Sequence, residues 1–146
     1  MTIEANKLLV RRFYEEIVNT GDVDRIGDFI APDCIEVHDN VVYESGIEGM
    51  KAHILGGRLT YSSLQLTVER QLGEGDWVVT QVTARGVHSG EWMGIAPTGK
   101  AVEFTCVNVD RVANGRIIEH GGAANMLGPL LRAGAIKAVG PGDSHA

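Results

Sequence analysis

The chain is poor in cysteine, proline and aromatic residues. Among its 146 residues there are two cysteines, four prolines and 5% aromatic side chains. Two cysteines without a CxxC spacing exclude a disulfide framework and a cysteine-rich zinc site. Cys34 and Cys106 both lie in apolar segments, so we expect two buried, reduced thiols in a cytoplasmic protein.

Positive charge and long apolar runs are also lacking. Lysine and arginine number 13 against 19 acidic residues, which gives a net charge of −6. Proteins that bind nucleic acid or anionic membranes usually cluster positive charge, so we expect neither partner. No segment approaches the roughly 20 apolar residues that cross a bilayer, and no signal peptide is visible at the N-terminus.

What the chain does contain is a set of helical patterns followed by strand patterns, which predicts an α+β fold. Helices are predicted at residues 3–19, 23–30 and 46–58, the last ended by Gly56-Gly57, with a small helix at 125–136. Strands are predicted at residues 34–40, 41–46, 63–73, 77–94, 101–112 and 116–122. Without a repeat or a linker, residues 1–146 should form one domain, with a flexible tail from about residue 139.

The predicted hairpin of residues 101–112 and 116–122 carries the most informative side chains. If residues 113–115 form a three-residue loop, Val112 pairs with Arg116 and Asn108 faces His120. If Asn114 and Gly115 instead form a two-residue turn, the register slips by one and His120 moves to the opposite face.

We favour the three-residue loop because it places apolar Phe104, Cys106 and Ile118 together on the inner face. His120 could then act as a base, since imidazole titrates near neutral pH, and Asn108 would be its hydrogen-bond partner. A buried, hydrogen-bonded structural histidine remains the alternative. The side chains that could line an apolar pocket beside it are Tyr14, His38, Met50, His53, His88, Trp92, Phe104 and Cys106. Such residues can equally form core.

Motifs for metals and nucleotides are missing from the sequence. The histidines show neither His-x-His nor HExxH spacing, and the glycine-rich pieces lack a phosphate-loop pattern. We therefore expect no metal and no cofactor.

Four segments resemble one family, in the right order along nearly the whole chain. They are RFYEEIVNTGDVDRIGDFIAPDCIEVHD, GVHSGEWMGIAPTGKAVEF, VDRVANGRIIEHGG and MLGPLL. Together they resemble the SnoaL-like polyketide cyclases of the NTF2-like superfamily. The resemblance implies a cone, in which a curved antiparallel sheet is wrapped by the N-terminal helices around an apolar pocket. It also implies cofactor-free, aldol-type ring closure of an aromatic polyketide ester.

In these cyclases an aspartate on the last strand is the acid/base, with a histidine on the neighbouring strand. An ungapped placement puts these roles at His120 and Cys106. Relatives also commonly read EHW followed by an aspartate, where this chain has Gly121 and Asn125.

The function expected from the resemblance is therefore a cyclase for a small apolar or aromatic molecule. The alternatives are a non-catalytic protein that binds a ligand in the same pocket, and another acid/base enzyme such as an isomerase or epoxide hydrolase. The outer face of the predicted hairpin carries Thr105, Val107 and Val109. An apolar sheet face needs a cover, so we expect a homodimer through it.

Overall fold

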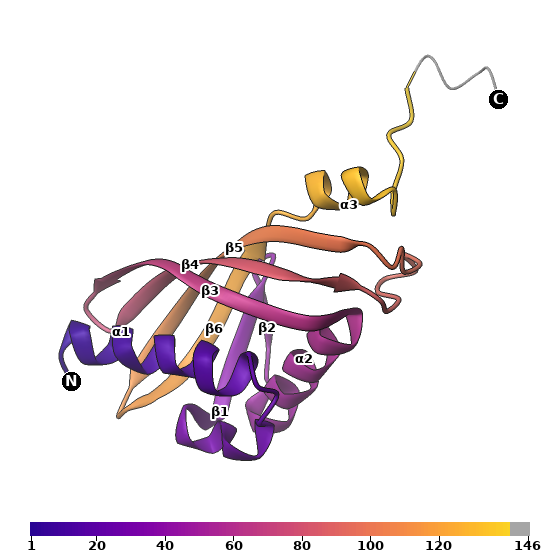
Figure 1. Cartoon of the computed structure of the whole chain (residues 1–146). Coiled ribbons are helices and arrows are strands. Elements are labelled where there is room, and N and C mark those ends of the chain that lie inside the picture. Colours follow the sequence, from indigo (N-terminus) through magenta and orange to yellow (C-terminus); the bar gives the residue numbers. More distant parts are fainter. Residues whose placement is uncertain (141–146) are drawn as a thin grey trace.

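The computed structural model describes residues 1–140 and shows a curved, open sheet of six strands with helices packed against it (Figure 1). The helical segments are α1 (Ile3–Arg12), the π-helix η1 (Phe13–Val18), the 3₁₀-helix η2 (Val23–Asp28), α2 (Gly46–Thr60) and α3 (Leu127–Ala133). The strands are β1 (Ile30–His38), β2 (Val41–Tyr43), β3 (Tyr61–Glu74), β4 (Trp77–His88), β5 (Ala101–Ala113) and β6 (Arg116–Ala124). The predicted α+β class is confirmed.

The strands lie in the order β2-β1-β6-β5-β4-β3. From β3 to β6 each strand pairs antiparallel with the next, as the sequence predicts, whereas β1 pairs parallel with β6. The parallel pairing brings the end of β1 beside the end of β6, with Glu36 opposite His120. This register places two chemically active residues next to each other.

Several boundaries differ from the sequence prediction, among them those of α2 and β1. Helix α2 continues through Gly56-Gly57 to Thr60, whose hydroxyl donates to the carbonyl of Gly56. Strand β1 begins at Ile30 rather than residue 34, because Ile30 pairs with Ile117 before the register shifts. Part of the predicted tail, residues 141–146, lies outside the described residues.

The core lies between the helices and the concave face of the sheet. Its buried members are Val10, Phe13, Tyr14, Ile17, Ile26, Phe29, Ile30, Cys34, Met50, Ile54, Val78, Val112 and Ile117. Burial of each large apolar side chain stabilises the fold by roughly 1.5–3 kcal/mol. Because α1, η1 and α2 all contribute to this cluster, it holds the helices at fixed positions over β5 and β6.

No helix in the part of the chain that the structure describes is long and apolar enough to cross a membrane.

The outer face of the sheet carries an apolar patch made of Leu72, Val79, Val107 and Val109, which lie on three adjacent strands. Val107 and Val109 are 47% and 37% exposed. If a second copy covers this patch, Val107→Lys should convert a dimer into a monomer, because the lysine charge would be buried in the interface. Sedimentation velocity at micromolar concentration measures this, and a monomeric wild-type protein would contradict the homodimer prediction.

Candidate active site

The β5–β6 hairpin has a register that neither sequence alternative describes. Asn114 and Gly115 form a two-residue turn with φ of 50° and 73°, so Ala113 pairs with Arg116. This is the left-handed backbone that Asn-Gly turns adopt in hairpins. The three-residue loop that the inner-face argument favours is therefore wrong.

A β-bulge then restores the inward direction of His120. The register shifts between Arg111 and Val112, which leaves Ile118 as the extra residue on β6. His120 consequently pairs with Asp110, and Asn108 pairs with Gly122. The predicted pairing of Asn108 with His120 is wrong, although His120 does lie on the same face as Asn108 and Cys106.

Asp110 and His120 form a buried hydrogen-bonded pair. His120 Nδ1 lies 2.6 Å from Asp110 Oδ1; Asp110 is fully buried and His120 is 8% exposed. A carboxylate accepts from the ring N–H, so this contact fixes the tautomer with the proton on Nδ1. Nε2 makes no hydrogen bond to any residue from 1 to 140, which leaves its lone pair available to take a proton.

The local charges adjust the basicity of this histidine. Burial disfavours the charged ring, but the charge and hydrogen bond of Asp110, together with the charge of Glu36, outweigh burial and raise the pKa of His120 above 6.5. A pKa raised above 6.5 strengthens the imidazole as a base near neutral pH.

Two buried oxygens beside this pair are not hydrogen-bonded to the described residues. They are the hydroxyl of Tyr14 and Oδ2 of Asp110. Burial and then the charge of Asp110 raise the pKa of Tyr14 well above its ordinary value, so the phenol keeps its proton. A buried donor without a partner costs roughly 1–3 kcal/mol, which a polar ligand atom would offset. Asn108 and Asp110 lie close enough to this hydroxyl for hydrogen bonding with each to affect its pKa, so a ligand oxygen would compete with these two side chains for its proton.

A second buried carboxylate, Glu36 on β1, lies at the other side of His120. It accepts from Ser45 Oγ at 2.6 Å and from His53 Nδ1, and His38 Nε2 lies 3.5 Å from it. Burial alone would raise the pKa of Glu36, but the His53 and Ser45 hydrogen bonds and the nearby histidine charges lower it to about 2. Glu36 is therefore ionised at neutral pH.

The ring of His53, which hydrogen-bonds to Glu36, also contacts the rings of two other histidines. It meets the ring of His120 edge-on at 6.0 Å between centroids and that of His38 at 5.7 Å. His53 comes from α2, whereas the other two histidines come from β6 and β1. Its side chain is 50% exposed, so the cluster opens to solvent at this ring.

Glu36, His38 and His53 also have the donor types of a metal site. One ligand atom from each lies within 4.8 Å of the others, and two histidines with a carboxylate can bind Zn²⁺ or Fe²⁺. In the structure the same atoms hydrogen-bond to one another. The expectation of a metal-free and cofactor-free protein remains a prediction.

The remaining predicted lining residues divide into two groups. Met50 is buried in the core, while Phe104 and Cys106 are half-buried on the concave face. Burial raises the pKa of the Cys106 thiol to about 11, so it is not a nucleophile at neutral pH.

His88 and Trp92 are not brought to His120. The ladder aligns His120 with Asp110 and Val78, and His88 lies ten residues further along β4. His88 is buried against the ring of Tyr61, and its Nδ1 lies 3.2 Å from Thr98 Oγ1. Trp92 is 48% exposed in the following loop.

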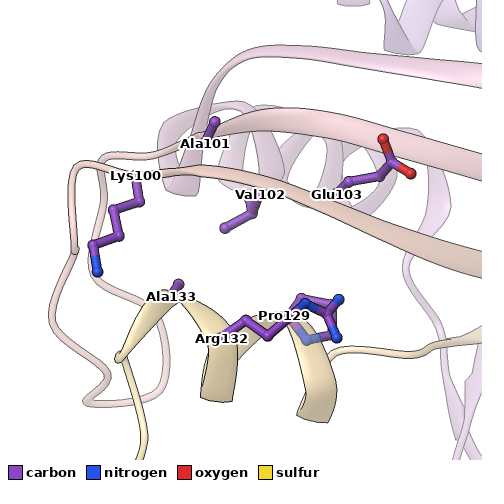
Figure 2. A pocket seen from close by; sticks show the side chains of 7 residues that line it. All are labelled: Lys100, Ala101, Val102, Glu103, Pro129, Arg132 and Ala133. Carbon is purple, nitrogen blue, oxygen red and sulfur yellow. The ribbon is translucent and has the colours of Figure 1, made fainter.

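Two cavities lie apart from the Asp110–His120 pair. One, of about 190 Å³, lies between the start of β5 and α3 (Figure 2). It is lined by Lys100, Ala101, Val102, Glu103, Pro129, Arg132 and Ala133. The other, of about 500 Å³, lies near Met1, Asn6, Gly75, Asp76, Val112, Ala113 and Asn114. Neither of these two cavities includes a predicted site residue, so neither is the candidate site.

Gly122 leaves room for Asn108 on the concave face. A Cβ at this position would overlap Asn108 Oδ1 and the backbone oxygen of Val107. Gly122→Ala should therefore lower the free energy of unfolding by roughly 1–3 kcal/mol, the usual cost of overpacking. Urea denaturation measures this loss of stability.

Gly56→Ala is the control for this prediction. The Cβ added at Gly56 meets nothing within 4 Å, and alanine in a helix interior should stabilise the protein by roughly 0.5–1 kcal/mol. Equal changes in the free energy of unfolding for the two variants would contradict the close approach of Gly122 to Asn108.

The sequence model of the SnoaL-like polyketide cyclases matches residues 8–132. The chain belongs to this family. Nogalonic acid methyl ester cyclase of Streptomyces nogalater is 30% identical over 121 residues, which cover 80% of this chain and 88% of that protein. Aklanonic acid methyl ester cyclase AcmA of Streptomyces galilaeus is 29% identical over 114 residues, 76% of this chain and 78% of that protein.

Solved structures agree with the family. AclR of Streptomyces galilaeus, for which a hydroxylase activity has been suggested, superposes with a TM-score of 0.81 at 28% identity. The superposition covers 96% of this chain and 87% of AclR. The predicted NTF2-like, SnoaL-like fold is confirmed.

Compared with the pattern that the resemblance implies for SnoaL-like cyclases, this chain exchanges the two residue types. The last strand, β6, carries the histidine, and the neighbouring β5 carries the aspartate. The bulge in β6 places Asp110 opposite His120, where the three-residue loop would have placed Asn108. An aspartate–histidine pair is therefore present, but the aspartate lies on β5 and the histidine on β6, the reverse of the arrangement that the resemblance implies.

Proposed function

We propose that this SnoaL-like protein catalyses intramolecular aldol-type ring closure of an aromatic polyketide ester, with His120 as the general base. The observation that carries this proposal is the buried Asp110–His120 pair, in which Nε2 has no partner among residues 1–140. Aldol closure requires removal of a proton from a carbon beside a carbonyl, which a neutral imidazole can accept. Asp110 holds the tautomer and stabilises the imidazolium that results.

Tyr14 supports the same reaction. Its buried, protonated hydroxyl lies close enough to Asp110 and Asn108 for both to affect its pKa. A hydrogen bond from this hydroxyl to the substrate enolate oxygen would stabilise the charge that develops during proton removal. The half-buried Phe104 and Cys106 would contact the apolar part of the substrate.

The relatives suggest the first substrates to try. The two curated relatives are named as cyclases of nogalonic acid methyl ester and aklanonic acid methyl ester. Both names describe methyl esters, so a molecule of this class is the substrate we propose. A buried carboxylate–histidine pair favours an enzyme over the alternative of a non-catalytic binding protein.

The experiment incubates the purified protein with each methyl ester and analyses the products by chromatography and mass spectrometry. Ring closure yields an isomer, so the expected product has the mass of the substrate and a different retention time. A product heavier by one oxygen would instead indicate the hydroxylation suggested for AclR. Tight binding without conversion would contradict catalysis and favour the binding protein.

A further inference from the structure

We propose that the cavity between α3 and the start of β5 is a binding site for a small dicarboxylate, whose two ends pair with Lys100 and Arg132 (Figure 2). The cavity is lined by residues 100–103 and by α3, so it lies apart from the Asp110–His120 pair. A ligand bound here is therefore independent of the proposed function, and the ring-closure mechanism does not use this surface.

The cavity is positively charged, in a chain whose net charge is −6. Of its seven lining residues, Lys100 and Arg132 are basic and Glu103 is acidic. Glu103 pairs with Arg85 at 2.7 Å, and Figure 2 shows its side chain pointing away from α3. Neither Lys100 nor Arg132 pairs with an acidic group among residues 1–140. Both cations are therefore available to form charge-assisted hydrogen bonds with the carboxylates of a ligand.

Two glycines show where the cationic groups lie, at opposite ends of α3. The guanidinium of Arg132 lies beside Gly128, since a Cβ at position 128 would be 3.1 Å from Nη1. The ammonium of Lys100 lies near Gly134, the C-cap of the helix, where a Cβ would be 4.0 Å from Nζ. A helix rises about 1.5 Å per residue, so the two glycines are roughly 9 Å apart along its axis. A single carboxylate is too short to contact both cations at this spacing, whereas a short chain with a carboxylate at each end contacts both.

The surface between the two cations is apolar. It is formed by Val102 on β5 and by Pro129 and Ala133 on α3, all three of which are buried. A chain of methylene groups would contact these side chains and leave its two ends beside the cations. The cavity has a volume of about 190 Å³, less than the roughly 300–1,000 Å³ of sites for drug-sized molecules. The ligand is therefore small.

Both charged side chains are attached to well-held backbone. The carbonyl of Lys100 accepts from the N–H of His88 at 2.9 Å, and the N–H of Lys100 donates to Thr98 Oγ1 at 3.3 Å. Arg132 lies on α3, which is held against β5 because its neighbour Ala133 belongs to the same apolar cluster as Val102. The ends of the two side chains are exposed, but their attachment points are fixed. A ligand that binds here therefore has only side chains to order, which keeps the entropic cost of binding small.

The test titrates the ¹⁵N-labelled protein at constant ionic strength with adipate, hexanoate and hexanediol, which share one carbon chain and differ in the number of carboxylates. The amide resonances of Val102 and Ala133 report binding. Adipate should bind with a dissociation constant on the order of 1 mM, because exposed ion pairs and a small contact area support only weak binding. Hexanoate should bind about fivefold more weakly, the effect of losing one exposed ion pair. Hexanediol should leave both resonances unchanged.

Charge variants separate this site from a general attraction of anions. Lys100→Gln and Arg132→Gln should each bind adipate no better than the wild type binds hexanoate, because each variant keeps only one of the two cations. Lys51→Gln is the matched control: it removes the same charge from α2, where Lys51 pairs with Glu48, and should bind adipate as the wild type does. Lys100 and Arg132 are exposed, so the spectra of their variants should otherwise match that of the wild type.

Three results would overturn the dicarboxylate site. They are equal affinities of the wild type for adipate and hexanoate, adipate binding that leaves the resonances of Val102 and Ala133 unchanged, and adipate binding that Lys100→Gln and Arg132→Gln both retain at the wild-type level. None of these results bears on ring closure, because neither Lys100 nor Arg132 takes part in it. Failure of the dicarboxylate site and failure of the proposed function are therefore distinguishable.

Discussion

His120→Ala should lower the turnover of the methyl ester substrates about 10²–10⁴-fold, the usual effect of removing a general base. Substrate affinity should change much less, because Phe104, Cys106 and Tyr14 remain in place. Steady-state kinetics would show the loss in kcat, and ligand titration would show the retained binding. His120 is expected to have this large effect because its Nε2 is the atom that accepts the substrate proton.

Alanine at position 120 also leaves the buried Asp110 without its partner, which can destabilise the fold. His120→Gln separates the two effects, because the amide can still donate to Asp110 but cannot act as a base. Both variants should be inactive, and His120→Gln should keep the wild-type circular dichroism spectrum. Thr105→Ala, on the outer face of β5, is the activity control. Near-normal turnover by a folded His120→Gln would remove His120 from the mechanism.

Glu36→Gln should lower the free energy of unfolding by roughly 3 kcal/mol at neutral pH. This follows from the pKa of Glu36, which falls from an ordinary 4.5 to about 2 in the folded protein. The carboxylate is 6% exposed, so solvent screens its hydrogen bonds with Ser45 and His53 only weakly. Urea denaturation of both proteins at a series of pH values measures the difference.

The pH dependence of this difference has a defined sign. A folded pKa below the unfolded one means that the stabilisation is fully present above about pH 5. It is lost as the pH falls through 4.5 towards 2, because Glu36 then becomes protonated in both states. The two proteins should therefore converge in stability near pH 2. A difference that stays constant from pH 7 to pH 2 would show that the charge of Glu36 is not the cause.

The element order could be predicted from the sequence because periodicity reports which face of each element is buried. Apolar spacing predicts α1, and alternation predicts β5 and β6, both of which the structure contains. The hairpin register could not be predicted, because a bulge at Ile118 depends on pairing across strands rather than on local sequence. With the two-residue turn alone His120 would pair with Val109, and the one extra residue at Ile118 moves the pairing to Asp110.

The site residues predicted from the sequence do not include the two carboxylates, although strand alternation indicates the position of both. Asp110 follows Asn108 and Cys106 at intervals of two, so strand alternation alone puts it on the inner face with them. Glu36 alternates with Cys34 and His38 in the same way. Neither position, however, reveals a partner: the pairing of Glu36 with His53 joins a strand to a helix 17 residues later. Sequence spacing does not encode that contact.

The measurement that tests the Asp110–His120 mechanism most directly is the pH profile of kcat/KM for ring closure, in wild-type protein and in Asp110→Asn. This profile reports the pKa of the base in the free enzyme. Asp110 and Glu36 together raise the pKa of His120 despite burial, so the acid limb of the wild type should have its midpoint above pH 6.5. Asp110→Asn should move that midpoint to lower pH and reduce the maximal rate. Superimposable acid limbs in the two proteins would contradict a general base formed by Asp110 and His120.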